Sequence, residues 1–342
     1  MVTAGTERQF ALARCGVVAA SEPHQGVLMA VAQDAVLAPS GAQYEISSGP
    51  QRATVTEVGA SLRTYTLEGT DIIDGFGIAE RSSAGRGQVL APWPNRLDHG
   101  RYVFDGQEGR VALDEPDLSN AIHGMVRWLP WDLLARSGNT AQLGCVLHPQ
   151  PGYPWRLELR VGYHLGDDGL EVTADAANLS EAVLPFGIGF HPYLTVGTPT
   201  VDDAYLSVPA RRRLVTDARG LPVGDAEVTG TEFDFTTRRP LGRVDLDTAY
   251  TGLVRDDDGR ARVQLDDAAG RRVELWADDA FGYLMAFTGD TIQPVGRRRK
   301  AIAIEPMTCP PNALASGRDV IRIGPGQSWR GHWGIRPLES DP

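Results

Sequence analysis

Residues 156–176, RLELRVGYHLGDDGLEVTADA, decide the fold class of this chain. Apolar side chains stand at every second position before and after the central Gly-Asp-Asp-Gly. Such alternation buries one face of a β-strand while the other face meets water. Gly and Asp are residues that tight hairpin turns favour. The stretch therefore predicts two antiparallel strands joined by a turn at residues 166–169.

The same pattern recurs along the chain. An alternating stretch covers residues 141–147, and a second hairpin is indicated at residues 261–265 and 273–277. Helical periodicity is scarce, and its best stretch is residues 26–37. The 39 glycines and 23 prolines favour many short strands joined by turns over a helical bundle. We therefore predict an all-β fold, a large antiparallel β-sandwich.

The chain shows no linker and no shift in composition after residue 44. We therefore predict one β-sandwich domain over residues 43–338. Residues 1–42 are expected to form an N-terminal extension of uncertain order.

Composition and charge limit the classes of partner. The 342 residues carry 33 Lys and Arg against 44 Asp and Glu, a net charge of −11 that repels nucleic acid and anionic membranes. No apolar run approaches the ~20 residues of a membrane helix, and the first residues lack the layout of a signal peptide. The three cysteines are far apart, which argues against a disulfide framework or structural zinc. We expect a cytoplasmic protein, monomer or dimer, with neither nucleic acid nor a membrane as partner.

Four segments place ionisable residues among Gly, Pro or strongly apolar neighbours: residues 92–97 (PWPNRL), 121–128 (AIHGMVRW), 184–193 (LPFGIGFHPY) and 301–306 (AIAIEP). Glu305 is the sharpest signal, because the run before it predicts a strand buried on both faces. Burial would raise the pKa of its carboxyl group towards neutrality, as a general base requires. The alternative is a strand-end glutamate paired with an arginine.

The two histidines in these segments each have two interpretations. His191 lies in an apolar, glycine-punctuated stretch and precedes Pro192. It is either a general acid near neutral pH or a hydrogen-bonded histidine of the core. His123, between Ile122 and Gly124, has the same ambiguity.

Arg96 and three tryptophans are further candidates. Arg96 follows a Pro-Trp-Pro-Asn turn, where it is either an exposed surface arginine or a substrate ligand. Trp93, Trp128 and Trp131 could stack on the apolar C–H face of a sugar, although core packing is the commoner role of a tryptophan.

Two basic runs, residues 211–213 and 297–300, are expected to be solvated loops. Their alternative is an anchor for a phosphate or sulfonate group. The motifs of zinc proteases, P-loop proteins and serine hydrolases are absent from the sequence, so we expect no metal ion and no cofactor. The remaining inventory of histidines, arginine and carboxylate suits proton transfer on a neutral polar substrate.

Taken in order, four stretches resemble the aldose 1-epimerase (galactose mutarotase-like) family: PWPNRLDHGRYVFDG at 92–106, IHGMVRW at 122–128, FGIGFHPY at 186–193 and IAIEPMTCPPNA at 302–313. The resemblance spans residues 44–336. It implies a β-sandwich of the galactose mutarotase type with a sugar site on one concave face, and a small-molecule sugar as partner. By the same resemblance, His191 matches the family's general acid and Glu305 its general base.

The resemblance also implies the residues that hold the sugar. Arg96 and His123 match residues that hydrogen-bond sugar hydroxyls, and Asp247 matches the substrate-binding aspartate, with Asp245 as its alternative. The same segments supply Asn95 and Trp128 as further substrate-binding candidates.

Two positions depart from the galactose-active branch of the family, which tends to have Asn before the acid and Gln two residues after the base. Here Phe190 and Met307 stand there. The leading hypothesis is a 1-epimerase of a free aldohexose, and a hexose-6-phosphate or other anionic sugar is the alternative substrate. A non-catalytic sugar-binding protein would instead keep Glu305 and His191 far apart, and a glycoside hydrolase would use Asp247 with Glu305.

Overall fold

The computed structural model describes residues 38–338. Residues 1–37 lie outside it, and with them most of the predicted extension and the candidate helix at 26–37. No helix within the described residues is long and apolar enough to cross a membrane.

The predicted hairpin at the centre of the sequence is confirmed. β12 (Leu157–Gly166) and β13 (Gly169–Asn178) pair in antiparallel register, and their apolar side chains are buried on one face. The other predicted strands are also present, as β11 (Thr140–Leu147), β22 (Ala261–Asp266) and β23 (Arg272–Ala277).

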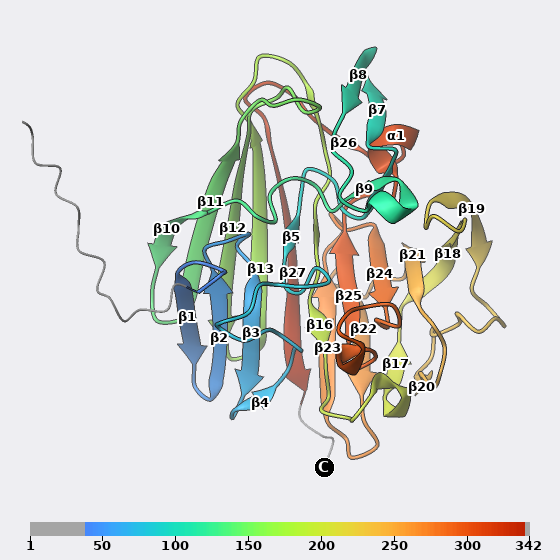
Figure 1. Cartoon of the computed structure of the whole chain (residues 1–342). Coiled ribbons are helices and arrows are strands. Elements are labelled where there is room, and N and C mark those ends of the chain that lie inside the picture. The colour runs from blue at the N-terminus through green and yellow to red at the C-terminus, as the bar shows by residue number, and fades with distance from the viewer. Residues whose placement is uncertain (1–37, 339–342) are drawn as a thin grey trace, which may run out of the picture. The chain divides into compact units, whose positions relative to one another are not determined.

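Two large antiparallel sheets dominate the described part of the chain (Figure 1). A nine-stranded sheet has the spatial order β10 (Asp132–Arg136), β11, β12, β13, β27 (Ser328–Leu338), β23, β22, β17 (Tyr205–Ser207) and β20 (Arg239–Pro240). An eight-stranded sheet has the order β19 (Pro222–Glu227), β18 (Ala210–Thr216), β21 (Asp247–Leu253), β24 (Tyr283–Phe287), β25 (Ile302–Met307), β15 (Gly189–Phe190) and β5 (Val89–Leu90), and β16 (Tyr193–Leu194) also pairs with β25.

Smaller elements surround these sheets. They are the sheet of β1 (Gln43–Ser48), β2 (Gln51–Thr56), β3 (Leu62–Leu67) and β4 (Thr70–Asp71), the pairs β6 (Arg96–Asp98) with β9 (Asn120–Ile122), β7 (Arg101–Phe104) with β8 (Gln107–Arg110) and β14 (Leu184–Phe186) with β26 (Ile321–Ile323), the helix α1 (Ala313–Ser316), and 3-10 turns at Pro116–Leu118, Val201–Asp203 and Val295–Arg297. The small sheet is fastened to β12, because Tyr163 donates a hydrogen bond to the carbonyl of Ala60 at 2.6 Å.

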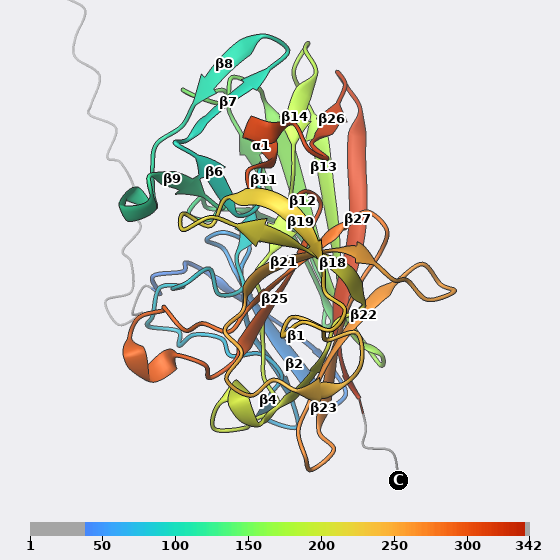
Figure 2. The same ribbon diagram turned by 90° about the vertical axis from the view of Figure 1, so that its right-hand side faces the viewer.

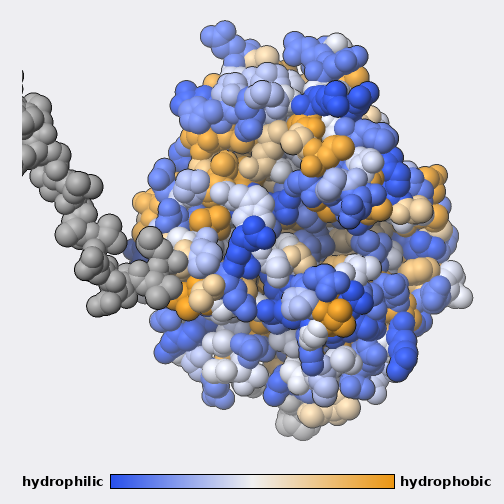
Figure 3. All heavy atoms as spheres, viewed as in Figure 1, coloured by the Kyte–Doolittle hydropathy of each residue, from blue (hydrophilic) through white to orange (hydrophobic). Residues whose placement is uncertain are grey.

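The two large sheets share one hydrophobic core. The ring of Phe190 on β15 lies 5.0 Å from that of Trp333 on β27, and one cluster of buried side chains draws residues from both sheets. Figure 2 turns the side that carries β18, β19 and β21 towards the viewer. In Figure 3, hydrophilic side chains cover most of the visible face and hydrophobic residues form separate patches. The predicted all-β sandwich is confirmed.

Strand β25 is buried along its whole length and divides two environments. Ile302 and Ile304 point into the shared core, whereas Ala303 and Met307 belong to two smaller clusters on the opposite face. Because side chains alternate along a strand, Glu305 lies on that opposite face between Ala303 and Met307.

The prediction of two solvated basic loops is wrong for residues 211–213 and correct only in part for residues 297–300, a loop in which the arginines are half-buried and Lys300 is exposed. Residues 211–213 belong to strand β18, where the guanidinium of Arg213 lies 3.8 Å above the ring of Phe233. In the other run, Arg297 pairs with Asp74 at 2.9 Å, and Arg299 pairs with two aspartates. Carboxylates on neighbouring loops hold these arginines against the protein, and sequence spacing alone cannot reveal such partners.

Candidate active site

All the site residues predicted from the sequence line one cavity of about 500 Å³, a size typical of ligand pockets. They are Asn95, Arg96, His123, Trp128, His191, Asp247 and Glu305. These residues come from five separated parts of the sequence and from several strands and loops. Neither basic run named above lines this cavity.

Glu305 is 2% exposed and lies on β25 beside Met285 of β24. Its Oε1 is 3.2 Å from Nε2 of His191, and its Oε2 has no hydrogen-bond partner. Burial raises the pKa of Glu305 well above its usual value, Asp247 raises it further, and Arg96 opposes the rise. Within residues 38–338 Glu305 forms no ion pair with an arginine, so that alternative interpretation is wrong.

His191 is 4% exposed and follows β15. Its ring stacks on that of Tyr193 at 5.0 Å and meets the ring of His123 edge-on at 5.4 Å. Burial lowers the pKa of His191 well below its usual value, and the nearby charge of Arg86 lowers it further. Its Nδ1 has no hydrogen-bond partner.

Glu305 and His191 contact each other inside the cavity. The raised pKa of the carboxyl group and the lowered pKa of the imidazole both favour the neutral forms, in which the pair holds one proton. This contact also differs from the wide separation expected of a non-catalytic sugar-binding protein.

His123 is a neutral hydrogen-bond donor in the cavity. Its Nδ1 accepts the backbone N–H of Asn95 at 3.2 Å, which leaves the proton of the neutral ring on Nε2. Burial, together with the neighbouring His191 and Arg127, lowers the pKa of His123 well below its usual value. The turn that presents it requires Gly124, where a Cβ would lie 2.0 Å from the carbonyl oxygen of Ala91.

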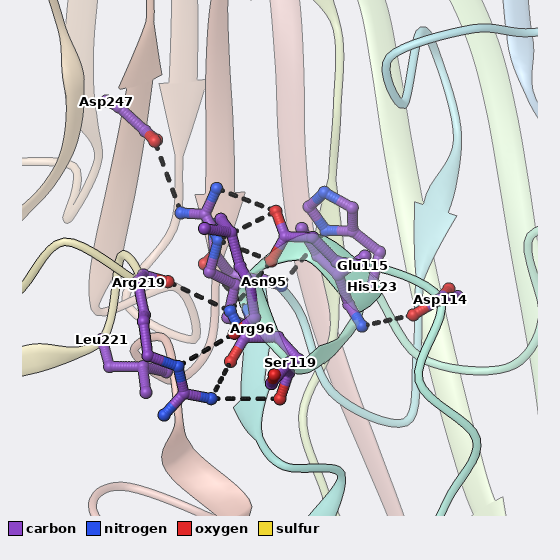
Figure 4. A network of polar contacts seen from close by, with 12 residues as sticks. Asn95, Arg96, Asp114, Glu115, Ser119, His123, Arg219, Leu221 and Asp247 are labelled. Carbon is purple, nitrogen blue, oxygen red and sulfur yellow. Dashed lines mark hydrogen bonds and ion pairs between the residues drawn. The ribbon is translucent and has the colours of Figure 1, made fainter.

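Arg96 is held between two carboxylates (Figure 4). Its Nε and Nη2 donate to Glu115, with the shortest contact 3.0 Å, and its Nη1 donates to Asp247 at 3.3 Å. Glu115 is itself oriented by the side-chain amide of Asn120. The alternative of a solvent-exposed surface arginine is therefore wrong. Sequence reasoning missed Glu115.

Asp247, rather than Asp245, lies at the cavity. Asp247 begins β21, lines the cavity and bonds Arg96. Asp245 instead faces Asp290; burial raises the pKa of Asp245, and the charge of Asp290 raises it further.

Of the three candidate tryptophans, only Trp128 lines the cavity. Trp128 is 48% exposed and lines the cavity, whereas Trp93 and Trp131 are buried in the core. Two arginines flank its ring, Arg81 at 5.3 Å and Arg127 at 5.8 Å.

Sequence reasoning also missed the segment 82–88, which forms one wall of the cavity. It reads SSAGRGQ, and both glycines have a positive φ, 76° at Gly85 and 68° at Gly87. Two glycines so close together signal a tight backbone turn, which is the only sign of this wall in the sequence. Over residues 38–338, no group of three or more His, Cys, Asp or Glu side chains is arranged to hold a metal ion.

Known proteins resemble this chain over most of its described residues. The model of a family described as aldose 1-epimerase matches residues 42–336. The chain is 30% identical over 292 residues to the uncharacterized protein YihR of Escherichia coli (strain K12), covering 85% of this chain and 92% of that protein.

Solved structures share the fold. A GalM/aldose epimerase homologue from C. elegans superposes with a TM-score of 0.77 at 18% identity, covering 88% of this chain and 99% of that one. A galactose 1-epimerase from Lactobacillus acidophilus NCFM gives a TM-score of 0.71 at 20% identity, covering 87% and 95%. With the family match over most of its length and a fold of this type, the chain belongs to the aldose 1-epimerase family.

Proposed function

We propose that this protein is a cofactor-independent aldose 1-epimerase that interconverts the α and β anomers of a free aldohexose. The observation that carries the proposal is the contact of 3.2 Å between Glu305 and His191 in the cavity. The hemiacetal hydroxyl O1 and the ring oxygen O5 are both bonded to C1. Two adjacent proton-transfer groups can therefore serve both oxygens of one sugar.

In the proposed reaction the ring opens and recloses. Glu305 takes the proton of the O1 hydroxyl, the C1–O1 bond becomes a carbonyl, the C1–O5 bond breaks and His191 protonates O5. Rotation about C1–C2 presents the other face of the aldehyde. Reclosure returns both protons, so atoms and charge balance over the cycle.

The single proton of the pair suits both half-reactions. A carboxylate beside an imidazolium is the form that opens the ring, and a carboxylic acid beside a neutral imidazole is the form that closes it. The surroundings favour the neutral form in the free protein. Movement of the proton between the two groups then converts one form into the other.

The remaining cavity residues would hold the sugar in reach of the pair. Arg96, fixed by Glu115 and Asp247, and His123 as a neutral donor would hydrogen-bond sugar hydroxyls. Fixed donors of this kind lower the entropy loss on reaching the reactive geometry. Asn95 and the exposed face of Trp128 complete the proposed contacts.

The test follows the optical rotation of freshly dissolved α-glucose and α-galactose at neutral pH with a chelator present. We expect faster decay to the same equilibrium, and loss of about 10²–10⁴-fold of the catalysed rate in Glu305→Gln and in His191→Asn. Glu274→Gln is the matched control, because Glu274 is an equally buried strand glutamate that pairs with Arg336 away from the cavity. Full activity in the Glu305→Gln variant would remove Glu305 from the role of base.

A second candidate substrate is an anionic aldose. It is favoured by Arg81, which lines the cavity beside Trp128 and forms no ion pair with the other described residues, and by Arg127, whose guanidinium also lies near that ring. A free guanidinium at a rim is suited to a phosphate or sulfonate.

Kinetics with glucose 6-phosphate and with the variant Arg81→Gln distinguish the two candidate substrates. If the substrate is anionic, we expect the wild type to have a lower KM for glucose 6-phosphate than for glucose. We also expect Arg81→Gln to raise the KM for glucose 6-phosphate and to leave the KM for glucose unchanged. An equal effect of the variant on both sugars would exclude the anionic assignment. No acceleration with any of the three sugars would favour a binding protein.

A further inference from the structure

His191 is enclosed by the segment 82–88, which the sequence did not identify. The backbone N–H of Gly87 donates to the carbonyl of His191 at 2.9 Å, and that of His191 donates to the carbonyl of Gln88 at 3.2 Å. A Cβ at Gly85 would lie 2.3 Å from Cδ2 of the imidazole. The backbone of this segment therefore touches both the main chain and the ring of His191.

Arg86, in the same segment, is a charged residue with only 1% exposure. Its Nε donates to Asp74 at 3.0 Å and its Nη1 donates to the carbonyl of Ser83 at 3.2 Å. Asp74 also accepts a hydrogen bond from Arg297. Arg297 in turn pairs with Glu80 at 3.6 Å, so Arg86, Arg297 and the two carboxylates form one ion-pair network.

The guanidinium of Arg86 lies 4.4 Å from the centre of the Tyr193 ring, and that ring also stacks with the imidazole of His191, with an interplanar angle of 18°. The hydroxyl of Tyr193 donates to the carbonyl of Ala84 at 2.8 Å, which fixes the ring to the segment 82–88. The ion pair with Asp74 offsets the cost of burying the Arg86 guanidinium. Its place against the ring that stacks on His191 points to a role in the site.

We propose that Arg86 and Tyr193 are positioning residues, forming an arginine–tyrosine–histidine stack that fixes the His191 imidazole against Glu305 and places a positive charge near the imidazole. This inference rests on the proposed function, in which His191 is the general acid. A positive charge behind the ring makes the imidazolium a stronger acid, so that it yields its proton to O5 more readily.

The groups around His191 are consistent with that role. They are Glu305 from β25, His123 after β9, Arg127 before Trp128, Tyr193 on β16 and Arg86 from the segment 82–88. Of these, Arg86 and Arg127 oppose a positive charge on the ring, and Arg86 has the larger effect on its pKa. Only Glu305 offers a carboxylate to the imidazolium, at 3.2 Å.

The experiment measures the protonation of His191 without any sugar. The imidazole resonances are followed by NMR against pH in the wild type and in Arg86→Met, with His191→Asn to assign the signal. We expect the wild-type ring to stay neutral well below the ordinary histidine pKa of ~6.5, and the Arg86→Met ring to titrate at higher pH, closer to that value. An unchanged titration in Arg86→Met would overturn the proposal.

Kinetics supply the second readout. In Arg86→Met, kcat should fall about 10- to 100-fold with little change in KM, because a small misplacement of a reacting group has effects of this size. In Arg86→Met, the acidic limb of the pH–rate profile should move to higher pH, in parallel with the titration of His191. Arg86→Lys should keep that limb near the wild-type position, since it keeps the charge.

Tyr193 gives an independent test should Arg86→Met fail to fold. Tyr193→Phe keeps the stacked ring and should retain more of kcat than Tyr193→Leu, which removes the ring. Equal kcat in both variants would contradict a positioning role. Arg255→Met is the matched control: Arg255 binds backbone carbonyls of Ala277, Asp278 and Phe281 and lies outside the cavity lining, so its loss should leave the pH profile unchanged.

The two proposals fail in different ways. If no sugar is epimerised and Arg86→Met still shifts the titration of His191, the proposed function fails and the stack stands. If sugars are epimerised and the titration does not move, the stack fails alone.

Discussion

Glu305 and His191 illustrate how a buried pair obtains its reactivity from its surroundings. Burial disfavours the carboxylate form of Glu305 and so raises its pKa, and the charge of Asp247 raises it further. Burial disfavours the imidazolium form of His191 and so lowers its pKa, and the charge of Arg86 lowers it further. The result is a pair that shares one proton and can pass it in either direction.

The raised pKa of Glu305 predicts a gain in stability on neutralisation. A group whose pKa is higher in the folded protein contributes stability below its unfolded pKa of ~4.3 and loses it as pH rises through the folded pKa. We therefore expect Glu305→Gln to melt above the wild type at neutral pH, by a margin that grows from pH 5 to pH 8. Thermal unfolding at a series of pH values measures this margin.

Glu274→Gln is again the control for that prediction. Its carboxylate accepts hydrogen bonds from Arg336 and Gln264, so its neutralisation should lower the melting temperature. A Glu305→Gln variant that is less stable than the wild type at every pH would contradict the burial argument.

The lowered pKa of His191 predicts an unusual pH profile. The acidic limb of kcat/KM arises when the pair takes up a second proton, and a lowered pKa moves this event to lower pH. We expect kcat/KM to stay level as pH falls through ~6.5, the ordinary histidine pKa. Polarimetry with buffer catalysis subtracted tests it, and a half-loss of activity near 6.5 would contradict it.

At the scale of elements, short strands and one glycine-rich turn carry the site. β25 offers Ile302 and Ile304 to the core and Glu305 to the cavity, because its side chains alternate. The segment 82–88 contributes through its backbone rather than through side chains. Its glycines with positive φ let the main chain pack directly on His191.

Gly85→Ala tests that close approach. Alanine at a φ of 76° is strained by about 1 kcal/mol, and its Cβ would also displace the imidazole 2.3 Å away. We expect a small loss of stability and a large loss of kcat. Gly69→Ala is the matched control, with a φ of 77° and no atom within 4 Å, so it should lose similar stability and keep full activity. Equal kcat in the two variants would argue against a role for the close approach of Gly85 to the His191 ring.

At the scale of the whole sandwich, the residues that stabilise the fold and the residues of the proposed site lie on different faces of the sheets. The two large sheets enclose one hydrophobic core, while the cavity lies on the outer face of β25. Substitutions in the core should therefore lower stability without altering the site.

Leu159→Ala tests this separation. Leu159 is fully buried on β12, and its truncation should destabilise the fold by about 2–5 kcal/mol with kcat unchanged in the folded fraction. Its neighbour Arg160 faces solvent, and Arg160→Ala should change stability by less than about 1 kcal/mol. Denaturant unfolding monitored by fluorescence measures both. Similar losses in the two variants would contradict the inward and outward alternation of β12.

The sequence by itself determined the fold class and identified seven of the residues that line the cavity. Alternation along residues 156–176 is a local property of the chain, so it predicted strands and turns where the structure has them. Segment motifs identified Glu305 and His191, because a carboxylate and an imidazole in apolar, turn-bounded surroundings stand out from their neighbours.

Only the tertiary structure decided how those residues meet. His191 and Glu305 are over a hundred positions apart, and their contact depends on the pairing of β15 and β16 with β25. The choice of Asp247 over Asp245, the exposure of Trp128 and the carboxylates around the arginines have the same origin. The alternation of apolar residues and the local composition are properties of neighbouring residues, so they can be read from the sequence. Contacts across the sandwich join segments that are far apart in the sequence, and they depend on strand register and side-chain packing.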